Sequence, residues 1–148
     1  MKIRCDFVTN SSSSSFILGF KDKKSVQSTI DASKSSVFDN TDYRTECEHD
    51  YERLVRDCKK KGKDFETVLK EAEWEFKERA EWREYFKNNK FQDDEEIIKE
   101  NAKKQIEEFK EKAKDDTYFV YVEYDDHESM LDYLLRKAPY TLECFSHH

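Results

Sequence analysis

Glycine and proline are nearly absent from this chain, with two glycines and one proline among 148 residues. Glycine permits the positive φ angles of tight turns and proline interrupts helices, so few positions here force a break. The sequence therefore predicts long, uninterrupted elements. Charged residues make up 41% of the chain, but eleven Phe, eight Tyr and two Trp supply apolar surface for a core. The length fits one domain with one core.

The middle of the chain, residues 43–114, carries apolar side chains at intervals of three and four, the spacing of one face of a helix. A first helix is expected to end at Gly62 in the left-handed conformation. Asp64 can cap a second helix, which continues to Asn88, and Asp93 begins a third. Three consecutive helices are therefore expected in this segment.

Glutamates stand four residues before a lysine or arginine throughout these helices, the favourable order for surface ion pairs. Each pair contributes about 0.2 to 0.5 kcal/mol to local helicity. The predicted pairs are Glu52–Arg56, Glu66–Lys70, Glu73–Lys77, Glu75–Arg79, Glu95–Lys99, Glu100–Lys104 and Glu108–Lys112.

Both ends of the chain carry strand patterns. Residues 2–9 alternate polar and apolar side chains, and residues 16–20 form a short apolar run. Residues 117–124 are dense in aromatic and β-branched side chains, so this strand is expected at the centre of the sheet. A short helix that ends at Pro139 precedes a last strand over residues 140–145.

These elements predict an α+β fold in which the N- and C-terminal segments form a small sheet and the central segment forms three helices. We expect one domain over residues 1–148. Residues 1–40, with one short helix, and 115–148 form the sheet frame, and 41–114 form the helical segment.

Charge and cysteine content restrict the class of partner. The net charge of -7 opposes binding to nucleic acid or anionic lipid. No stretch is long and apolar enough for a membrane span, and the first residues lack a secretion signal, so a cytoplasmic protein is expected. Cys5, Cys47, Cys58 and Cys144 are widely spaced, which predicts reduced thiols. Cys47 and His49 point to different sides of a helix and are not expected to share a metal ion.

Five consecutive serines follow Asn10, more than a turn requires. Their hydroxyl and backbone N–H groups could bind an anion such as phosphate. A solvated hairpin connection or polar strand edge is the preferred interpretation, because no glycine and no Lys-Ser or Lys-Thr pair follows. The candidate anion site comprises Asn10, Ser11, Ser12, Ser13, Ser14 and Ser15.

The segment from Asp6 to Phe16, D-F-V-T-N-S-S-S-S-S-F, resembles the opening of many small uncharacterised bacterial and phage-associated proteins. The resemblance covers about eleven residues and implies no catalytic residue. It implies a bacterial, phage or mobile-element origin, and such elements often encode small inhibitors of host defence, including anti-CRISPR proteins.

The acidic turn from Asp125 to Glu128 follows the strand at 117–124. Carboxylates and an imidazole there could bind a metal ion or act as acid and base. The same residues are suited to cap the following helix, which is the preferred interpretation. We therefore predict neither a metal nor another cofactor.

Trp74 lies about 160° around an ideal helix from Phe76, on a different side from the expected buried stripe. An exposed cluster of aromatic residues and arginines is typical of protein-binding hot spots, although packing on another helix is the alternative. The predicted partner surface comprises Trp74, Arg79, Trp82, Arg83, Tyr85 and Phe86.

The sequence contains no G-x-S-x-G, H-E-x-x-H or dinucleotide glycine motif, so an enzyme is not favoured. The first hypothesis is a non-enzymatic protein-binding module, an inhibitor whose partner is a host defence effector. The alternatives are a small-ligand or anion binder that uses the serine segment and, less favoured, a metal-dependent enzyme centred on Asp125 to Glu128.

Overall fold

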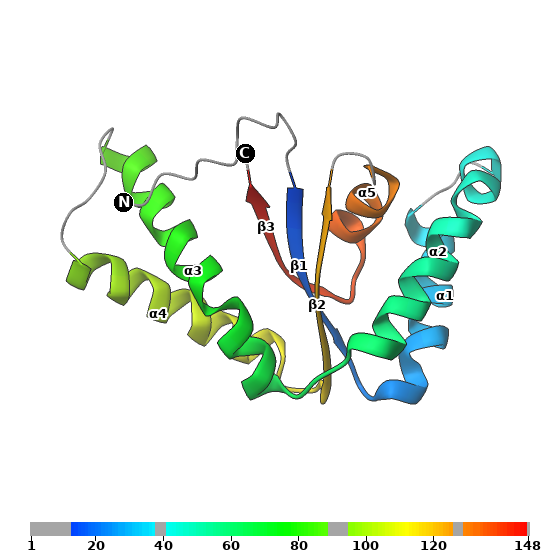
Figure 1. Cartoon of the computed structure of the whole chain (residues 1–148), viewed down its shortest axis with the longest axis horizontal. Coiled ribbons are helices and arrows are strands. Elements are labelled where there is room, and N and C mark those ends of the chain that lie inside the picture. Colours follow the sequence, from blue (N-terminus) through cyan, green and yellow to red (C-terminus); the bar gives the residue numbers. More distant parts are fainter. Residues whose placement is uncertain (1–12, 38–40, 89–94, 126–128, 148) are drawn as a thin grey trace.

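The computed structural model describes residues 13–37, 41–88, 95–125 and 129–147 (Figure 1). Three antiparallel strands form one sheet in the order β2-β1-β3: β1 is Ser13–Phe20, β2 is Tyr118–Asp125 and β3 is Thr141–His147. Strands from both ends of the chain build this sheet, which confirms the predicted α+β class. The strand predicted over residues 2–9 lies outside the described residues.

The expectation that the aromatic strand β2 lies at the centre of the sheet is wrong. The central strand is β1, whose residue Phe16 pairs with Val122 of β2 and with Cys144 of β3. Strand propensity reflects how side chains pack on the two faces and does not separate an edge strand from a central one. The richness of β2 in aromatic residues follows from its burial on both faces by helices.

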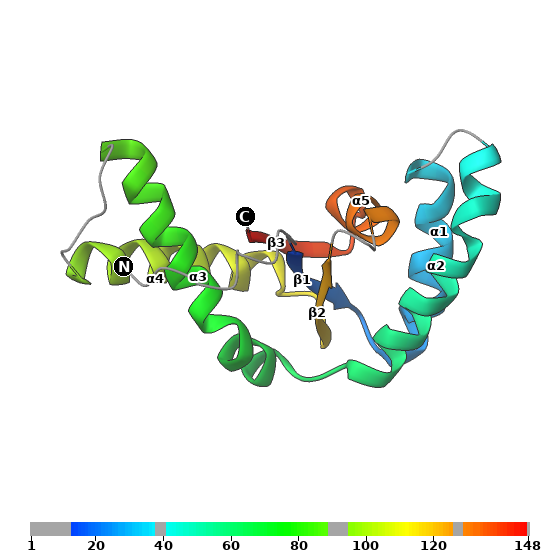
Figure 2. The ribbon, with the colours of Figure 1, turned by 45° about the horizontal axis from the view of Figure 1, so that its top comes forward.

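The sheet lies between two groups of helices (Figure 1). One group, with α1, α2 and α5, covers one face, and α3 and α4 cover the other, as the turned view also shows (Figure 2). The helices are α1 (Val26–Val37), α2 (Thr41–Lys61), α3 (Phe65–Asn88), α4 (Glu95–Lys112) and α5 (Ser129–Lys137), with a 3-10 turn η2 (Lys23–Ser25) before α1. The three predicted central helices are confirmed as α2, α3 and α4.

Alternate residues of β1 enter two separate cores, one on each face of the sheet, so the expectation of a single core is wrong. Phe16, Leu18 and Phe20 pack with α1, α2 and α5, whereas Ile17 packs with α3 and α4. Successive side chains of a strand point to opposite faces, so a central strand buried on both faces must be apolar at consecutive positions. This requirement explains the uninterrupted apolar run of β1.

The core between the sheet and the α3–α4 pair is built from phenylalanine rings. The Phe76 ring centroid lies 5.6 Å from that of Phe109 and 5.1 Å from that of Phe145 on β3. Phe65 stacks on Phe109 at 5.1 Å. The inner face of α3 is thereby anchored, with Val68, Ala72, Phe76 and Ala80 all fully buried.

Gly62 follows α2, but its backbone is not in the predicted left-handed conformation. A Cβ atom at this position would lie 1.7 Å from Cζ of Tyr118. The Tyr118 hydroxyl lies 2.7 Å from the carbonyl oxygen of Cys58 and 2.9 Å from that of Lys59, so it donates to the end of α2. Glycine is therefore required for the close approach of this ring.

The change Gly62→Ala is expected to lower the free energy of unfolding by about 1 to 3 kcal/mol, because the new methyl group displaces the Tyr118 ring. Urea denaturation measures this effect. In a Tyr118→Ala background the same change should lower the free energy of unfolding much less, because the clashing ring is absent. An equal cost in both backgrounds would show that the ring is not the cause.

Candidate functional site

The structure divides the predicted partner surface into an exposed part and an inward part. Trp74 and Trp82 are 44% and 36% exposed, and Arg83 is exposed. Tyr85 is half-buried, with its ring 5.6 Å from the Trp82 ring in an edge-on arrangement. The side chain of Phe86 lies outside the described residues. Trp74, Trp82, Arg83 and Tyr85 thus contribute to the outer surface of α3.

Arg79, also named in the predicted partner surface, is half-buried and faces the sheet. Its guanidinium donates to Glu143 Oε2 at 3.0 Å, to Gln105 Oε1 at 2.7 Å and to the carbonyl oxygen of Cys144 at 3.3 Å. The guanidinium carbon also lies 4.5 Å from the centroid of the Phe145 ring. Because Glu143 is only 6% exposed, its charge needs a close cation, which Arg79 supplies. Arg79 is therefore a structural residue.

Two buried carboxylates lie on the α3–α4 side of the sheet, and sequence reasoning missed both. Glu143 also approaches Lys112 Nζ, at 3.4 Å. Glu75, 2% exposed, accepts a hydrogen bond from the Tyr121 hydroxyl. Burial, together with this bond, raises the pKa of Tyr121 above its usual value. Both carboxylates have partners within the fold, so we interpret them as structural.

A groove of about 710 Å³ lies on the outer surface between α3 and α4. Its apolar part consists of Trp74 from α3 and of Ala102 and Ile106 from α4. Two carboxylates, Glu73 and Glu107, also line it. The remaining lining residues are the lysines Lys70, Lys77, Lys99, Lys103 and Lys110.

None of these five lysines has its Nζ atom within 4.0 Å of a carboxylate oxygen in the described ranges. The predicted pairs Glu66–Lys70, Glu73–Lys77 and Glu95–Lys99 do not form. Exposed ion pairs gain little, because ordering a long lysine side chain costs up to about 2 kcal/mol of entropy. The ammonium groups of the groove are therefore available to a partner.

The other predicted pairs are likewise not found: Glu52–Arg56, Glu75–Arg79, Glu100–Lys104 and Glu108–Lys112. Arg79 and Lys112 bind Glu143 on β3 instead. A buried carboxylate attracts a cation more strongly than an exposed one on the same helix, since water screens the latter.

Ser13, Ser14 and Ser15 begin the central strand β1 and do not form a connection between strands. The Ser14 hydroxyl accepts a hydrogen bond of 2.7 Å from Arg136, and the Ser15 hydroxyl donates to Glu123 at 3.3 Å. These three residues are thus part of the sheet and not of a separate anion-binding loop. Asn10, Ser11 and Ser12 lie outside the described residues, where the anion site stays a prediction.

The acidic turn is described only at Asp125, the last residue of β2; residues 126–128 lie outside the described ranges. Within those ranges no group of three or more His, Cys, Asp or Glu side chains is placed to hold a metal ion. Cys58 is buried and Cys144 half-buried, and both are free thiols. The side chain of Cys47 lies outside the described residues.

The Cys58 thiol is expected to be the less reactive of these two in the native protein. Burial, together with the charge of Asp57, raises its pKa to about 12, so very little of this thiol is ionised to the reactive thiolate at pH 8. Brief alkylation at pH 8 followed by peptide mass spectrometry should leave Cys58 unmodified until denaturant is added. Modification of Cys58 as fast as that of a free thiol would contradict this burial.

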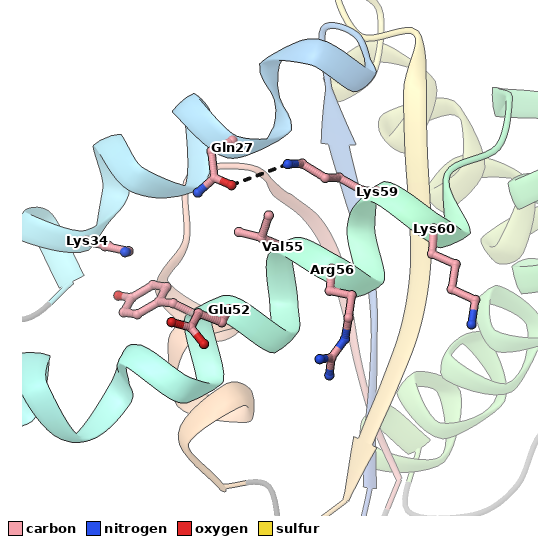
Figure 3. A pocket seen from close by; sticks show the side chains of 8 residues that line it. Gln27, Lys34, Glu52, Val55, Arg56, Lys59 and Lys60 are labelled. Carbon is pink, nitrogen blue, oxygen red and sulfur yellow. Dashed lines mark hydrogen bonds between the residues drawn. The ribbon is translucent and has the colours of Figure 1, made fainter.

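A second hollow, of about 460 Å³, lies between α1 and α2 and is lined by Gln27, Lys34, Tyr51, Glu52, Val55, Arg56, Lys59 and Lys60 (Figure 3). Its cations do not converge. Lys59 Nζ lies 3.5 Å from Gln27 Oε1, while Arg56 and Lys60 extend away from that pair (Figure 3). Lys34 pairs with Asp31 and Glu48. The α3–α4 groove is therefore the stronger candidate.

None of the helices in the part of the chain that the structure describes combines the length and the apolar character needed to cross a membrane. The chain matches no protein-family model, no curated protein and no solved structure.

Proposed function

We propose that the protein is a non-enzymatic protein-binding module whose partner docks on the outer surface of α3 and α4. The observation that carries this proposal is Trp74, which is 44% exposed at the α3–α4 groove. A large aromatic side chain in contact with water gains strongly when a partner covers it, which is why Trp dominates binding hot spots.

The rigidity of α3 supports the proposal. Its opposite face is fixed by Phe76 and its fully buried neighbours, so the outer side chains are held in place before a partner binds. Preorganisation of this kind reduces the entropy lost on association. Trp82 and Tyr85, in contact with each other further along α3, extend the aromatic surface.

The test compares Trp74→Ala with the native protein in capture from host lysate and then in a binding titration with the purified partner. We expect at least about a 30-fold loss of affinity, since truncation of a hot-spot residue removes about 2 kcal/mol or more. The matched control is Lys24→Ala, an exposed residue of η2 on the other side of the sheet. Unchanged affinity of Trp74→Ala would reject this surface.

The narrower proposal, inhibition of a host defence effector, rests on the sequence resemblance of residues 6–16. It is tested by expressing the chain in bacteria that carry a defined CRISPR system and measuring phage plating. Restored plating supports this role, and unchanged plating across the systems tested would count against it without affecting the binding module itself.

A further inference from the structure

We propose that the α3–α4 groove binds an acidic, amphipathic segment of a partner protein, whose carboxylates pair with the groove lysines while its apolar side chains cover Trp74 and Ile106. This inference rests on the proposed function and specifies the chemistry of the partner. It follows from the charge, the spacing and the apolar content of the groove.

The charge of the groove is opposite to that of the chain. Five lysines and two glutamates line it, which makes it positive, whereas the whole protein carries -7. None of the five ammonium groups forms an ion pair with another residue of the described ranges. A local positive groove on an acidic protein attracts an acidic segment, although the net charge of the whole protein would repel one.

The spacing of the lysines suits a helical or extended peptide. Lys70, Trp74 and Lys77 lie on one face of α3, and Lys99, Lys103 and Lys110 lie on one face of α4. At 1.5 Å per residue the α4 row spans about 16 Å, or about three turns of a partner helix. A segment of this length can place several carboxylates along the groove.

The apolar content favours a protein segment over a nucleic acid. Ala102 and Ile106 form an aliphatic strip beside Trp74, which suits Leu or Ile side chains. Single-stranded nucleic acids are bound by a series of aromatic platforms in a basic channel, and Trp74 is the aromatic residue of this groove. Glu73 and Glu107 also repel a continuous phosphate backbone.

The probe is a synthetic 14-residue amphipathic peptide with leucines at helical i, i+3, i+4 spacing and glutamates elsewhere. Its binding to the isotope-labelled full chain is followed by NMR. We expect the amides of residues 70–77 and 99–110 to shift, and the affinity to fall several-fold between about 50 and 300 mM salt because of screening. A peptide with lysine in place of glutamate and a 15-nucleotide oligothymidylate serve as competing probes.

The decisive variant is the double change Lys77→Glu and Lys103→Glu, which should weaken peptide binding at least about tenfold. Lys59→Glu and Lys60→Glu, the matched control on α2, alter the net charge equally but should have under about a twofold effect. Thermal melting verifies that both variants fold. Equal effects of the two variants, no binding of the acidic peptide, or tighter binding of the oligonucleotide would each overturn the inference.

The proposed function and this inference fail in different ways. If Trp74→Ala abolishes binding of the natural partner but the double variant at Lys77 and Lys103 still binds it, the proposed binding surface is supported and the acidic nature of the partner is refuted. If neither variant affects the partner, the surface itself is wrong.

Discussion

Replacement of Phe76 by alanine is expected to lower the free energy of unfolding by about 3 to 5 kcal/mol. Phe76 is fully buried, and its ring contacts those of Phe109 and Phe145, so truncation leaves a cavity between α3, α4 and β3. The two neighbouring rings belong to different elements, α4 and β3, and cannot close together without moving them. Guanidinium denaturation, monitored by circular dichroism, measures the loss.

The control for this prediction is Trp74→Ala, two residues earlier on the same helix. Trp74 is 44% exposed, so its truncation should cost under about 1 kcal/mol although it removes more atoms. Equal losses of unfolding free energy at the two positions would show that Trp74 is part of the core. The proposed partner surface would then lack its main exposed aromatic side chain.

The change Arg79→Met is expected to cost about 3 kcal/mol or more. Methionine keeps much of the contact with the Phe145 ring but leaves the buried Glu143 carboxylate with Lys112 alone. Removal of one partner from a buried ion pair is costly because the remaining charge cannot return to water. Arg83→Met, on the exposed surface one turn later, is the matched control and should change stability by under about 0.5 kcal/mol.

The combined variant Arg79→Met with Glu143→Gln identifies the cause. Because the amide of glutamine carries no charge, the double variant should recover more than half of the loss. Losses that simply add would mean that Arg79 stabilises the fold by packing on Phe145 rather than through Glu143.

The helical half of the fold was predictable because periodicity is a local property. Residues 43–114 show it directly, and the structure confirms three helices there. The sheet order was not predictable, since it depends on which strands lie side by side. Serines at the start of β1 suggested a connection, but Arg136 and Glu123, more than 100 residues away, provide the partners that their hydroxyls need in a buried strand.

The exposure of one predicted site residue followed from the sequence, whereas the arrangement around it did not. The angular position of Trp74 on α3 correctly indicated an outward side chain. The inward position of Arg79 depends on Glu143, and the groove depends on how α4 lies against α3; neither relation is visible in the spacing of residues along one helix. Because the sequence predicted that several of these lysines pair with glutamates on their own helix, it gave no reason to expect them to line a binding groove.

The central position of β1 also determines the order of events during synthesis. Both neighbours of β1 are translated about 100 residues or more after it, whereas each helix of the middle segment is complete within about 25 residues. Helices form locally and quickly, but a strand must wait for its partners. The apolar run of residues 16–20 therefore remains without its strand partners through most of translation, and this segment is where the nascent chain is most exposed to aggregation and to chaperone binding.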